Sequence, residues 1–159
     1  MSAIVAAEPS TAVHASAVAV GEAGILIRGA SGAGKSSLAD ALIIEATRRG
    51  LFGCLIGDDR IRLAVLGGRV TARPHPAIAG LMERRGLGIV TIASEAAVVL
   101  RFVADIALDG AAQASPRLPE DTDRSTSVAG VVLPRLVLLA DHTAQEQARR
   151  VLDAIGLLT

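Results

Sequence analysis

A glycine-rich segment that ends in lysine and serine carries the strongest chemical signal in the sequence. Residues 29–36 read Gly-Ala-Ser-Gly-Ala-Gly-Lys-Ser, which matches the phosphate-binding P-loop pattern in full. Glycines let successive backbone N–H groups converge on phosphate oxygens. Lys35 would place a positive charge beside the transferring phosphoryl group, and the Ser36 hydroxyl would be a ligand of Mg²⁺. The segment therefore predicts a site for the phosphates of a nucleoside triphosphate. The expected binding residues are Gly29, Ala30, Ser31, Gly32, Ala33, Gly34, Lys35, Ser36 and Ser37.

Lys35 differs from every other basic residue of the chain. The 16 basic residues include this single lysine, and all the others are arginines. A compact ammonium group and a planar guanidinium are not interchangeable inside a ring of backbone amides, so the contrast supports a working phosphate loop. Guanine recognition commonly uses an Asn-Lys-x-Asp loop, for which a second lysine would be needed. Among the P-loop classes, a small kinase therefore fits better than a GTPase or an oligomeric ATPase.

An acid pair follows the helix that the loop is expected to open. Asp58 and Asp59 close an apolar segment, and ligands gather at the carboxyl ends of strands in open α/β sheets. Because adjacent side chains of a strand alternate, we expect one acid to face the phosphate and the other to orient a neighbour. The first could act as base for an incoming hydroxyl group. Taken alone, the pair is explained equally well by a solvated turn.

Two further features could belong to the same site. The segment Glu83-Arg84-Arg85-Gly86-Leu87-Gly88 combines an acid, two bases and two glycines. A functional interpretation gives Glu83 to the metal ion and an arginine to phosphate, whereas a charged surface turn is slightly favoured on this segment alone. His14 precedes the loop, and a lone histidine is more often structural than catalytic. The spacing of His, Cys and acidic residues nowhere predicts a zinc site.

The elements that must position these groups predict an α/β fold, with a P-loop and a mixed β-sheet flanked by helices. Ser16–Val20 and Gly24–Arg28 are typical of a strand hairpin that runs into the loop. Helical periodicity covers Lys35–Arg49, and Gly50 is placed to end that helix. Further strands are expected at Leu51–Gly57, Ile61–Leu66, Val70–Arg73, Val98–Leu108 and Val131–Leu139, the last interrupted at Pro134, and an amphipathic helix at Thr143–Ile155.

The remaining segments have no regular pattern. We expect residues 1–11 to be a loose lead-in, Ala77–Met82 to form a short helix, and residues 109–129 to be a long mobile loop. No internal repeat or domain boundary is visible. Residues 1–159 are therefore interpreted as a single catalytic domain.

The composition indicates which kinds of binding partner and which cellular compartment to expect. The formal net charge is zero, and the chain has two Phe and neither Trp nor Tyr. A broad attraction to nucleic acid or membrane is therefore not indicated, and an aromatic platform for bases is absent. One cysteine allows no intrachain disulfide, and no apolar run reaches the ~20 residues of a membrane span. We expect a cytoplasmic protein.

Taken together, the motifs resemble the catalytic domain of the HPr kinase/phosphorylase family over residues 12–155. The matching features are His14 ahead of a hairpin, the P-loop, Gly57-Asp58-Asp59-Arg60 and Glu83-Arg84-Arg85-Gly86-Leu87-Gly88-Ile89. The last is similar to the family signature Glu-x-Arg-Gly-Leu-Gly-Ile. The resemblance implies an enzyme that uses ATP and Mg²⁺ to phosphorylate a serine of HPr, the carrier protein of the sugar phosphotransferase system. It also implies phosphorolysis of phosphoserine in reverse, and assembly into hexamers.

The resemblance also implies roles for individual residues. Asp59 matches the acid/base that takes the proton from the substrate hydroxyl, and His14 matches the histidine that assists it. Lys35 keeps its role in the P-loop, while Ser36 and Glu83 correspond to the Mg²⁺ ligands. Arg117 resembles the arginine of the family's mobile loop.

Several positions depart from the family pattern. Full-length members carry an additional N-terminal domain, whereas about a dozen residues precede His14 here, so we expect a short form that holds the catalytic domain alone. Ala30 stands where the family often has an acid. Ala140-Asp141-His142-Thr143 replaces a Pro-Gly-Arg-Asn-like segment associated with the reverse reaction, so the expectation of phosphorolysis is weakened and that of the kinase reaction is not. Two alternatives stay open: a small-molecule P-loop kinase and a non-catalytic regulator that binds ATP. The preferred donor among ATP, GTP and pyrophosphate is also open.

Overall fold

A central pair of parallel strands organises the molecule. The computed structural model describes residues 10–107 and 124–156. Strand β3 (Ala23–Gly29) lies parallel to β9 (Val98–Ala107), with Ile27 opposite Ala104. On the far side of β3, strand β2 (Ser16–Val20) runs antiparallel to it, and β4 (Gly53–Gly57) runs antiparallel to β2. The strand that leads into the glycine loop is thus paired on both edges.

The other edge of β9 has two partners in succession. Strand β6 (Arg69–Pro74) pairs antiparallel with the beginning of β9, and β11 (Val131–Leu139) pairs parallel with its second half. The sheet continues from β6 through β5 (Ile61–Leu66) to β1 (Thr11–Val13). Strand β10 (Ser125–Val128) pairs antiparallel with β11. The result is a mixed nine-stranded sheet.

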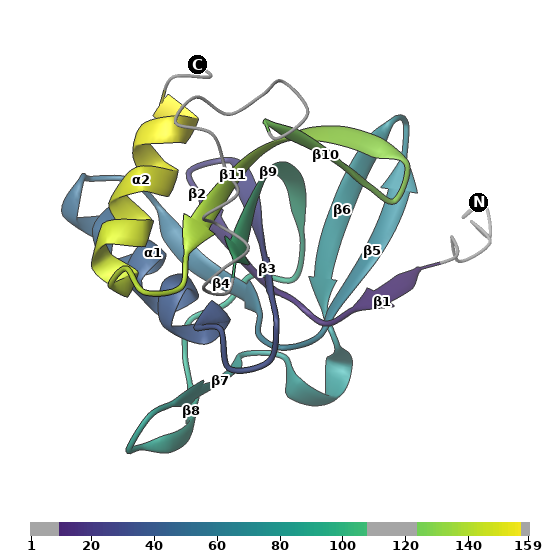
Figure 1. Cartoon of the computed structure of the whole chain (residues 1–159). Coiled ribbons are helices and arrows are strands. Elements are labelled where there is room, and N and C mark those ends of the chain that lie inside the picture. Colours follow the sequence, from purple (N-terminus) through teal and green to yellow (C-terminus); the bar gives the residue numbers. More distant parts are fainter. Residues whose placement is uncertain (1–9, 108–123, 157–159) are drawn as a thin grey trace.

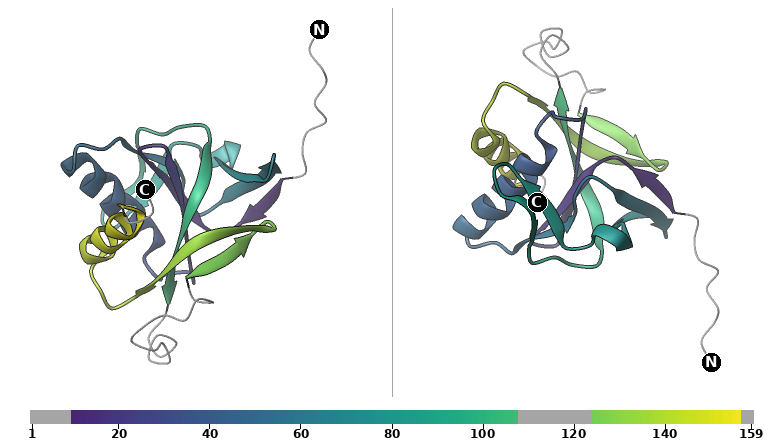
Figure 2. Two further views of the ribbon diagram at one scale, coloured as in Figure 1. Left: turned by 90° about the horizontal axis from the view of Figure 1, so that it is seen from above. Right: turned by 90° about the horizontal axis from the view of Figure 1, so that it is seen from below.

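Two helices cover one face of this sheet (Figures 1 and 2). Helix α1 (Lys35–Arg48) follows the glycine loop, and α2 (Ala144–Gly156) ends the described chain and packs beside α1. Residues of β3 alternate between the two faces, as strand geometry requires. Ile25 and Ile27 join the cluster beneath the helices, whereas Leu26 joins a second cluster on the opposite face, with β5 and β6. Two hydrophobic clusters therefore hold β3 from both sides.

A separate hairpin stands out below the sheet. Among the strands that the structure describes, β7 (Leu81–Arg84) and β8 (Gly88–Thr91) pair with each other alone, and a single turn of 3₁₀ helix, η1 (Pro76–Ile78), precedes them. Figure 1 shows the β7–β8 hairpin projecting near the beginning of α1. Met82, which is 1% exposed, anchors it in the helix-side cluster.

Most of the expected elements are confirmed, including the β2–β3 and β5–β6 hairpins and both helices. The short helix expected at Ala77–Met82 is wrong: Gly80 has a left-handed φ of 76°, which ends the 3₁₀ turn, and the chain then forms β7. The Leu51–Gly57 strand begins only at Gly53.

Other boundaries also need correction. The expected lead-in is shorter than residues 1–11, because Thr11 opens β1. The end of the segment 109–129 forms β10 and is not a loop, while its first part lies outside the described residues. Pro134 does not interrupt β11. The residue after it, Arg135, still belongs to the strand and donates its N–H to the Arg124 carbonyl oxygen at 2.8 Å.

Candidate active site

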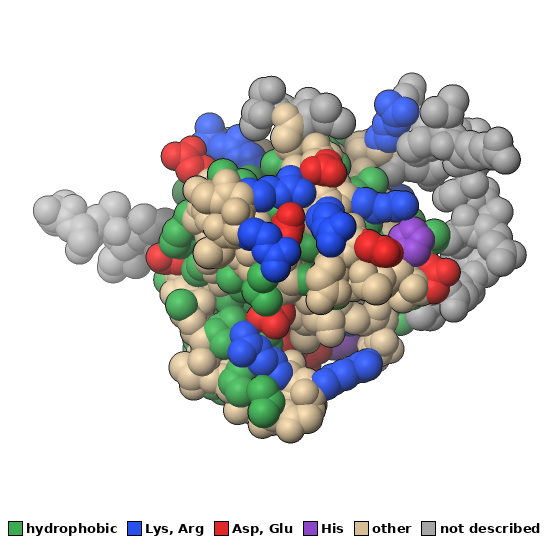
Figure 3. Space-filling model, turned by 90° about the vertical axis from the view of Figure 1, so that its left-hand side faces the viewer, with side chains coloured by type: hydrophobic (Ala, Val, Ile, Leu, Met, Phe, Trp, Pro, Cys, Tyr) green, Lys and Arg blue, Asp and Glu red, His purple; other side chains and the backbone are tan. Residues whose placement is uncertain are grey.

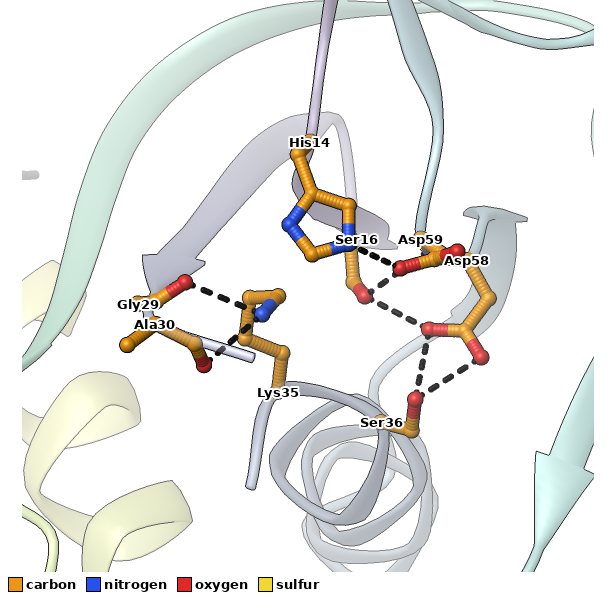
Figure 4. A network of polar contacts seen from close by, with 8 residues as sticks. All are labelled: His14, Ser16, Gly29, Ala30, Lys35, Ser36, Asp58 and Asp59. Atoms are coloured by element: carbon orange, nitrogen blue, oxygen red, sulfur yellow. Dashed lines mark hydrogen bonds and ion pairs between the residues drawn. The ribbon is translucent and has the colours of Figure 1, made fainter. Parts of the chain in front are cut away.

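The glycine loop between β3 and α1 forms the first wall of the site. Gly32 and Gly34 have φ values of 80° and 104°, which side chains with a Cβ rarely adopt. Lys35 is 6% exposed, and its Nζ donates to the carbonyl oxygens of Gly29 at 2.9 Å and Ala30 at 3.1 Å. The loop therefore wraps around its own lysine (Figure 4). Within the described ranges, carbonyl oxygens alone hold the ammonium group, so an incoming phosphate can compete for it.

A buried carboxylate faces the first turn of α1. Asp58, 5% exposed directly after β4, accepts one hydrogen bond from the Ser36 hydroxyl that is shared between its two carboxylate oxygens, at 2.9 and 2.8 Å. The same carboxylate accepts a 2.6 Å hydrogen bond from the fully buried hydroxyl of Ser16 on β2. Figure 4 shows Asp58 between the two serines. Hydrogen bonds to a carboxylate are among the stronger ones in proteins, so this arrangement fixes Ser36 in place.

Asp59 turns away from its neighbour and pairs with His14. Its φ of 69° lies in the left-handed region, which breaks the regular alternation of a strand. The carboxylate forms an ion pair with Nε2 of His14 (Figure 4), and its backbone N–H donates to Ser16 Oγ at 3.4 Å. The side chains of His14 and Asp59 are 52% and 61% exposed. Asp59 is thus held at the surface by a group that can exchange a proton with it.

Apart from the buried Asp58, which reaches this space through its hydrogen bond with Ser36, these groups line one cleft of about 730 Å³. Its walls come from the glycine loop, one face of α1, the β7–β8 hairpin and the beginning of α2. Figure 3 shows the face that carries the helices, with hydrophobic and basic side chains together at its lower end, where the hairpin projects in Figure 1. The polar lining residues used below are His14, Ser16, Lys35, Ser36, Asp40, Asp59, Glu83 and Arg84.

The hairpin brings Glu83 to the cleft without fixing it. Glu83 is exposed on β7, and its side chain has no hydrogen bond or ion pair with any residue in the described ranges. Its neighbour Arg84 donates from Nη2 to Asp40 Oδ1 of α1 at 2.8 Å. The hairpin is therefore tied to the P-loop helix one residue away from Glu83.

Behind the loop, a second polar cluster stabilises the end of β3. Arg28 donates from Nε and Nη2 to the two carboxylate oxygens of Asp105 on β9, at 2.7 and 2.8 Å, and Arg135 of β11 donates to the same group. Burial alone would raise the pKa of Asp105, but the hydrogen bonds and charges of the two arginines outweigh it and lower the pKa below its ordinary value. The carboxylate is therefore ionised and ties three strands together beside the glycine loop.

The comparisons with known proteins show the family of this chain. The family model of the HPr Serine kinase C-terminal domain matches residues 6–99, more than half of the chain. The chain belongs to this family. Relatives named HPr kinase/phosphorylase are 40% identical over 84 residues in Mycoplasma mycoides and 37% identical over 84 residues in Clostridium beijerinckii. Each match covers 53% of this chain and 25% or 26% of the relative, so the chain spans about a quarter of their length.

A solved structure of the family shows the same fold. It is the Hpr(Ser) kinase/phosphatase from Coxiella burnetii, with a TM-score of 0.72, 20% sequence identity, and coverage of 92% of this chain and 97% of that one. The expected α/β fold is thereby confirmed. Among the described residues, no helix is long and apolar enough to cross a membrane.

The structure brings together the expected catalytic and metal-binding residues that lie in its described ranges. His14, Lys35, Ser36 and Asp59 line the cleft with Glu83. Arg117 lies outside the described residues. Sequence reasoning missed Ser16 and Asp58 as parts of the site. Asp58 was passed over for its neighbour, although an acid after the second strand of a P-loop protein commonly shares the Mg²⁺ with the loop serine.

The oxygen atoms around Ser36 fit a magnesium ion. Mg²⁺ prefers hard oxygen ligands and is usually held by one or two protein groups together with substrate phosphates and water. The Ser36 hydroxyl and the Asp58 carboxylate supply two such oxygens already in contact. In the described part of the chain, no group of three or more His, Cys, Asp or Glu residues is placed to hold a metal without such help. The donor set therefore suits an ion that arrives with the nucleotide.

Proposed function

We propose that this chain is a protein serine kinase that transfers the γ-phosphoryl group of ATP to a serine of an HPr-like phosphocarrier protein. The observation that carries the proposal is the convergence of three devices on one cleft. These are a P-loop lysine held by the carbonyl oxygens of its own loop, an Asp58–Ser36 pair that suits Mg²⁺, and an exposed Asp59–His14 pair. Membership of the HPr kinase family supports the identity of the acceptor.

The first task of these residues is to hold the triphosphate. Backbone N–H groups of the loop and the amino-terminal end of α1 would bind the β- and γ-phosphates, and Lys35 would leave its carbonyl partners to follow the γ-phosphate. Ser36 and Asp58 would hold Mg²⁺, with Glu83 reaching it from across the cleft. The bound ion supplies charge neutralisation on the phosphates. The binding residues would thus fix the reacting phosphorus in line with the acceptor.

The second task is proton transfer at the acceptor hydroxyl. The serine oxygen attacks the γ-phosphorus, the bond to the β–γ bridging oxygen breaks, and ADP leaves. Asp59 takes the proton of the serine hydroxyl, and His14 holds the carboxylate toward the incoming group. In the reverse reaction, an oxygen of inorganic phosphate attacks the phosphorus of phosphoserine, the serine oxygen leaves with a proton from Asp59, and pyrophosphate forms. The kinase direction is the primary proposal.

Intact-mass spectrometry of HPr from the same cell tests the proposal. HPr would be incubated with the wild-type protein, ATP and Mg²⁺, in parallel with Asp59→Ala and with Glu22→Ala, which removes an exposed carboxylate from the β2–β3 turn. We expect one phosphate on a serine with the wild type and Glu22→Ala, and none with Asp59→Ala. Unmodified HPr despite ATP binding by the wild type would refute the proposal in favour of a metabolite kinase or a regulator. Full activity of Asp59→Ala would refute the role of the base.

A further inference from the structure

An ion pair on the wall of the cleft joins the P-loop helix to the hairpin. Arg84 Nη2 lies 2.8 Å from Asp40 Oδ1, and the two side chains are 40% and 29% exposed. Both line the cleft. Arg84 occupies the variable position of the Glu-x-Arg-Gly signature and Asp40 lies within α1, so the family pattern assigns neither of them a role.

The guanidinium group of Arg84 has more donors than acceptors around it. A guanidinium carries five N–H donors in a planar fork. Among the described residues, only Nη2 of Arg84 has a hydrogen-bond partner, and Nε is buried without one. A buried donor without an acceptor is unfavourable, whereas a phosphate presents several acceptor oxygens in the geometry that the fork matches. The remaining donors, at Nη1 and Nη2 of this 40% exposed side chain, therefore indicate a missing anionic partner, which the buried Nε could reach only if the side chain moved.

The location of the pair agrees with such a partner. Asp40 follows Ser36 by four residues, which places both on the same face of α1, about one helical turn apart. A phosphate chain that begins at Lys35 and extends along this face would pass the guanidinium group that Asp40 holds. An ion pair this exposed contributes little to stability, so holding the fold together is a weak reason for its presence.

We propose that Arg84, oriented by Asp40, binds a phosphate group of the nucleotide. The inference rests on the proposed function, because it assigns a further contact to the same nucleotide cleft. Arg84 is a binding residue in this account, and Asp40 is a positioning residue that acts through it. Together they would make the hairpin part of the phosphate site, in addition to the glycine loop.

Calorimetric binding of ATP and of inorganic tripolyphosphate tests the inference. The proteins are the wild type, Arg84→Gln and a matched control, Arg48→Gln, whose arginine is exposed on the last turn of α1. We expect Arg84→Gln to weaken both ligands by the same factor, about ten- to a hundred-fold, because the lost contact is with phosphate. The control should bind both as the wild type does.

Two further arms separate phosphate binding from indirect effects. The loss in Arg84→Gln should persist when EDTA replaces Mg²⁺; a loss that disappears with the metal would mean that Arg84 only positions Glu83, and would overturn the proposal. Asp40→Asn should weaken binding in the wild-type background but not in the Arg84→Gln background, since Asp40 acts through Arg84. Equal weakening in both backgrounds would contradict the positioning role.

The outcomes for this inference and for the proposed function are distinguishable. If the wild type binds neither ATP nor tripolyphosphate, the nucleotide function itself fails. If the wild type binds both and Arg84→Gln binds them equally well, only the role of Arg84 is refuted. A loss confined to ATP would assign Arg84 to the nucleoside and refute the phosphate contact.

Discussion

The buried hydroxyl of Ser16 offers a sharp test of how the acid pair is held. Ser16 is fully buried, donates to Asp58 at 2.6 Å and accepts a longer hydrogen bond from the Asp59 N–H group. Ser16→Ala removes one oxygen atom and leaves the shared hydrogen bond from Ser36 to Asp58 in place. A hydrogen bond to a charged group contributes about 1.5–3 kcal/mol, so we expect the free energy of unfolding to fall by about 2 kcal/mol. The melting temperature would fall by roughly 4–8 °C for a chain of this size.

Urea unfolding followed by far-ultraviolet circular dichroism is the appropriate assay, because the chain contains neither Trp nor Tyr for a fluorescence signal. Thr47→Ala is the matched control: its hydroxyl bonds the Ile43 carbonyl oxygen on an exposed part of α1, and the change should be close to neutral. In an Asp58→Asn background the acceptor is uncharged, so Ser16→Ala should lower the free energy of unfolding by only about 1 kcal/mol.

A stability of Ser16→Ala within about 0.5 kcal/mol of the wild type would refute this reasoning, since a lost charge-assisted hydrogen bond should exceed that value. An equal cost in the wild-type and Asp58→Asn backgrounds would show instead that the carboxylate charge does not account for the effect.

Three further predictions follow from the site and its surroundings. Asp59→Asn should slow phosphoryl transfer to HPr by about 10²–10⁴-fold in the mass assay and leave the Kd for ATP nearly unchanged; loss of ATP binding would contradict the role of the base. Because the pKa of Asp105 is lowered, its stabilisation is present above its ordinary pKa of about 4 and is lost as the pH falls through the lowered value. Asp105→Asn should therefore lose the acid-side part of the pH dependence of unfolding, and parallel curves for the two proteins would oppose this. Burial and, secondarily, the charge of Glu95 raise the pKa of the Cys54 thiol, so Ellman's reagent at pH 8 should modify it only on unfolding; rapid labelling of the native protein would argue otherwise.

Local signals predicted the parts of the fold that local physics determines. The glycines of the loop, the helical period from Leu38 to Ala46 and the turn at Gly67-Gly68 each specify a conformation without help from distant residues. The segment Ala77–Met82 misled the same reasoning. Its apolar residues suit a short helix, but Gly80 adopts a left-handed conformation and Met82 is drawn into the core as part of a strand.

Contacts between distant residues could not be read from spacing. The Asp58–Ser36 hydrogen bonds join residues 22 apart, and the Arg84–Asp40 pair joins residues 44 apart. The alternation of side chains along a strand predicted that Asp58 and Asp59 point to opposite faces. The left-handed φ of Asp59 breaks this alternation, so the actual direction of its side chain could not be predicted. The sequence thus predicted many of the chemical groups that line the candidate site, but not the part that Ser16 and Asp58 play in it or the hydrogen bonds that hold them.

The pairing of β3 with β9 has a consequence for the order in which the molecule folds. A short turn connects β3 to β2. The other edge of β3 pairs with β9, which lies much later in the sequence: Arg28 and Asp105, which are in contact, are 77 residues apart. Closing so long a loop reduces the conformational entropy of the chain before any stabilising contact between β3 and β9 can form, and this slows folding. The hairpin of β2 and β3 can form early, but the segment that becomes the glycine loop acquires its rigid base only when β9 docks. Pulse-labelled hydrogen exchange during refolding should accordingly protect the β2–β3 amides before those that β3 shares with β9.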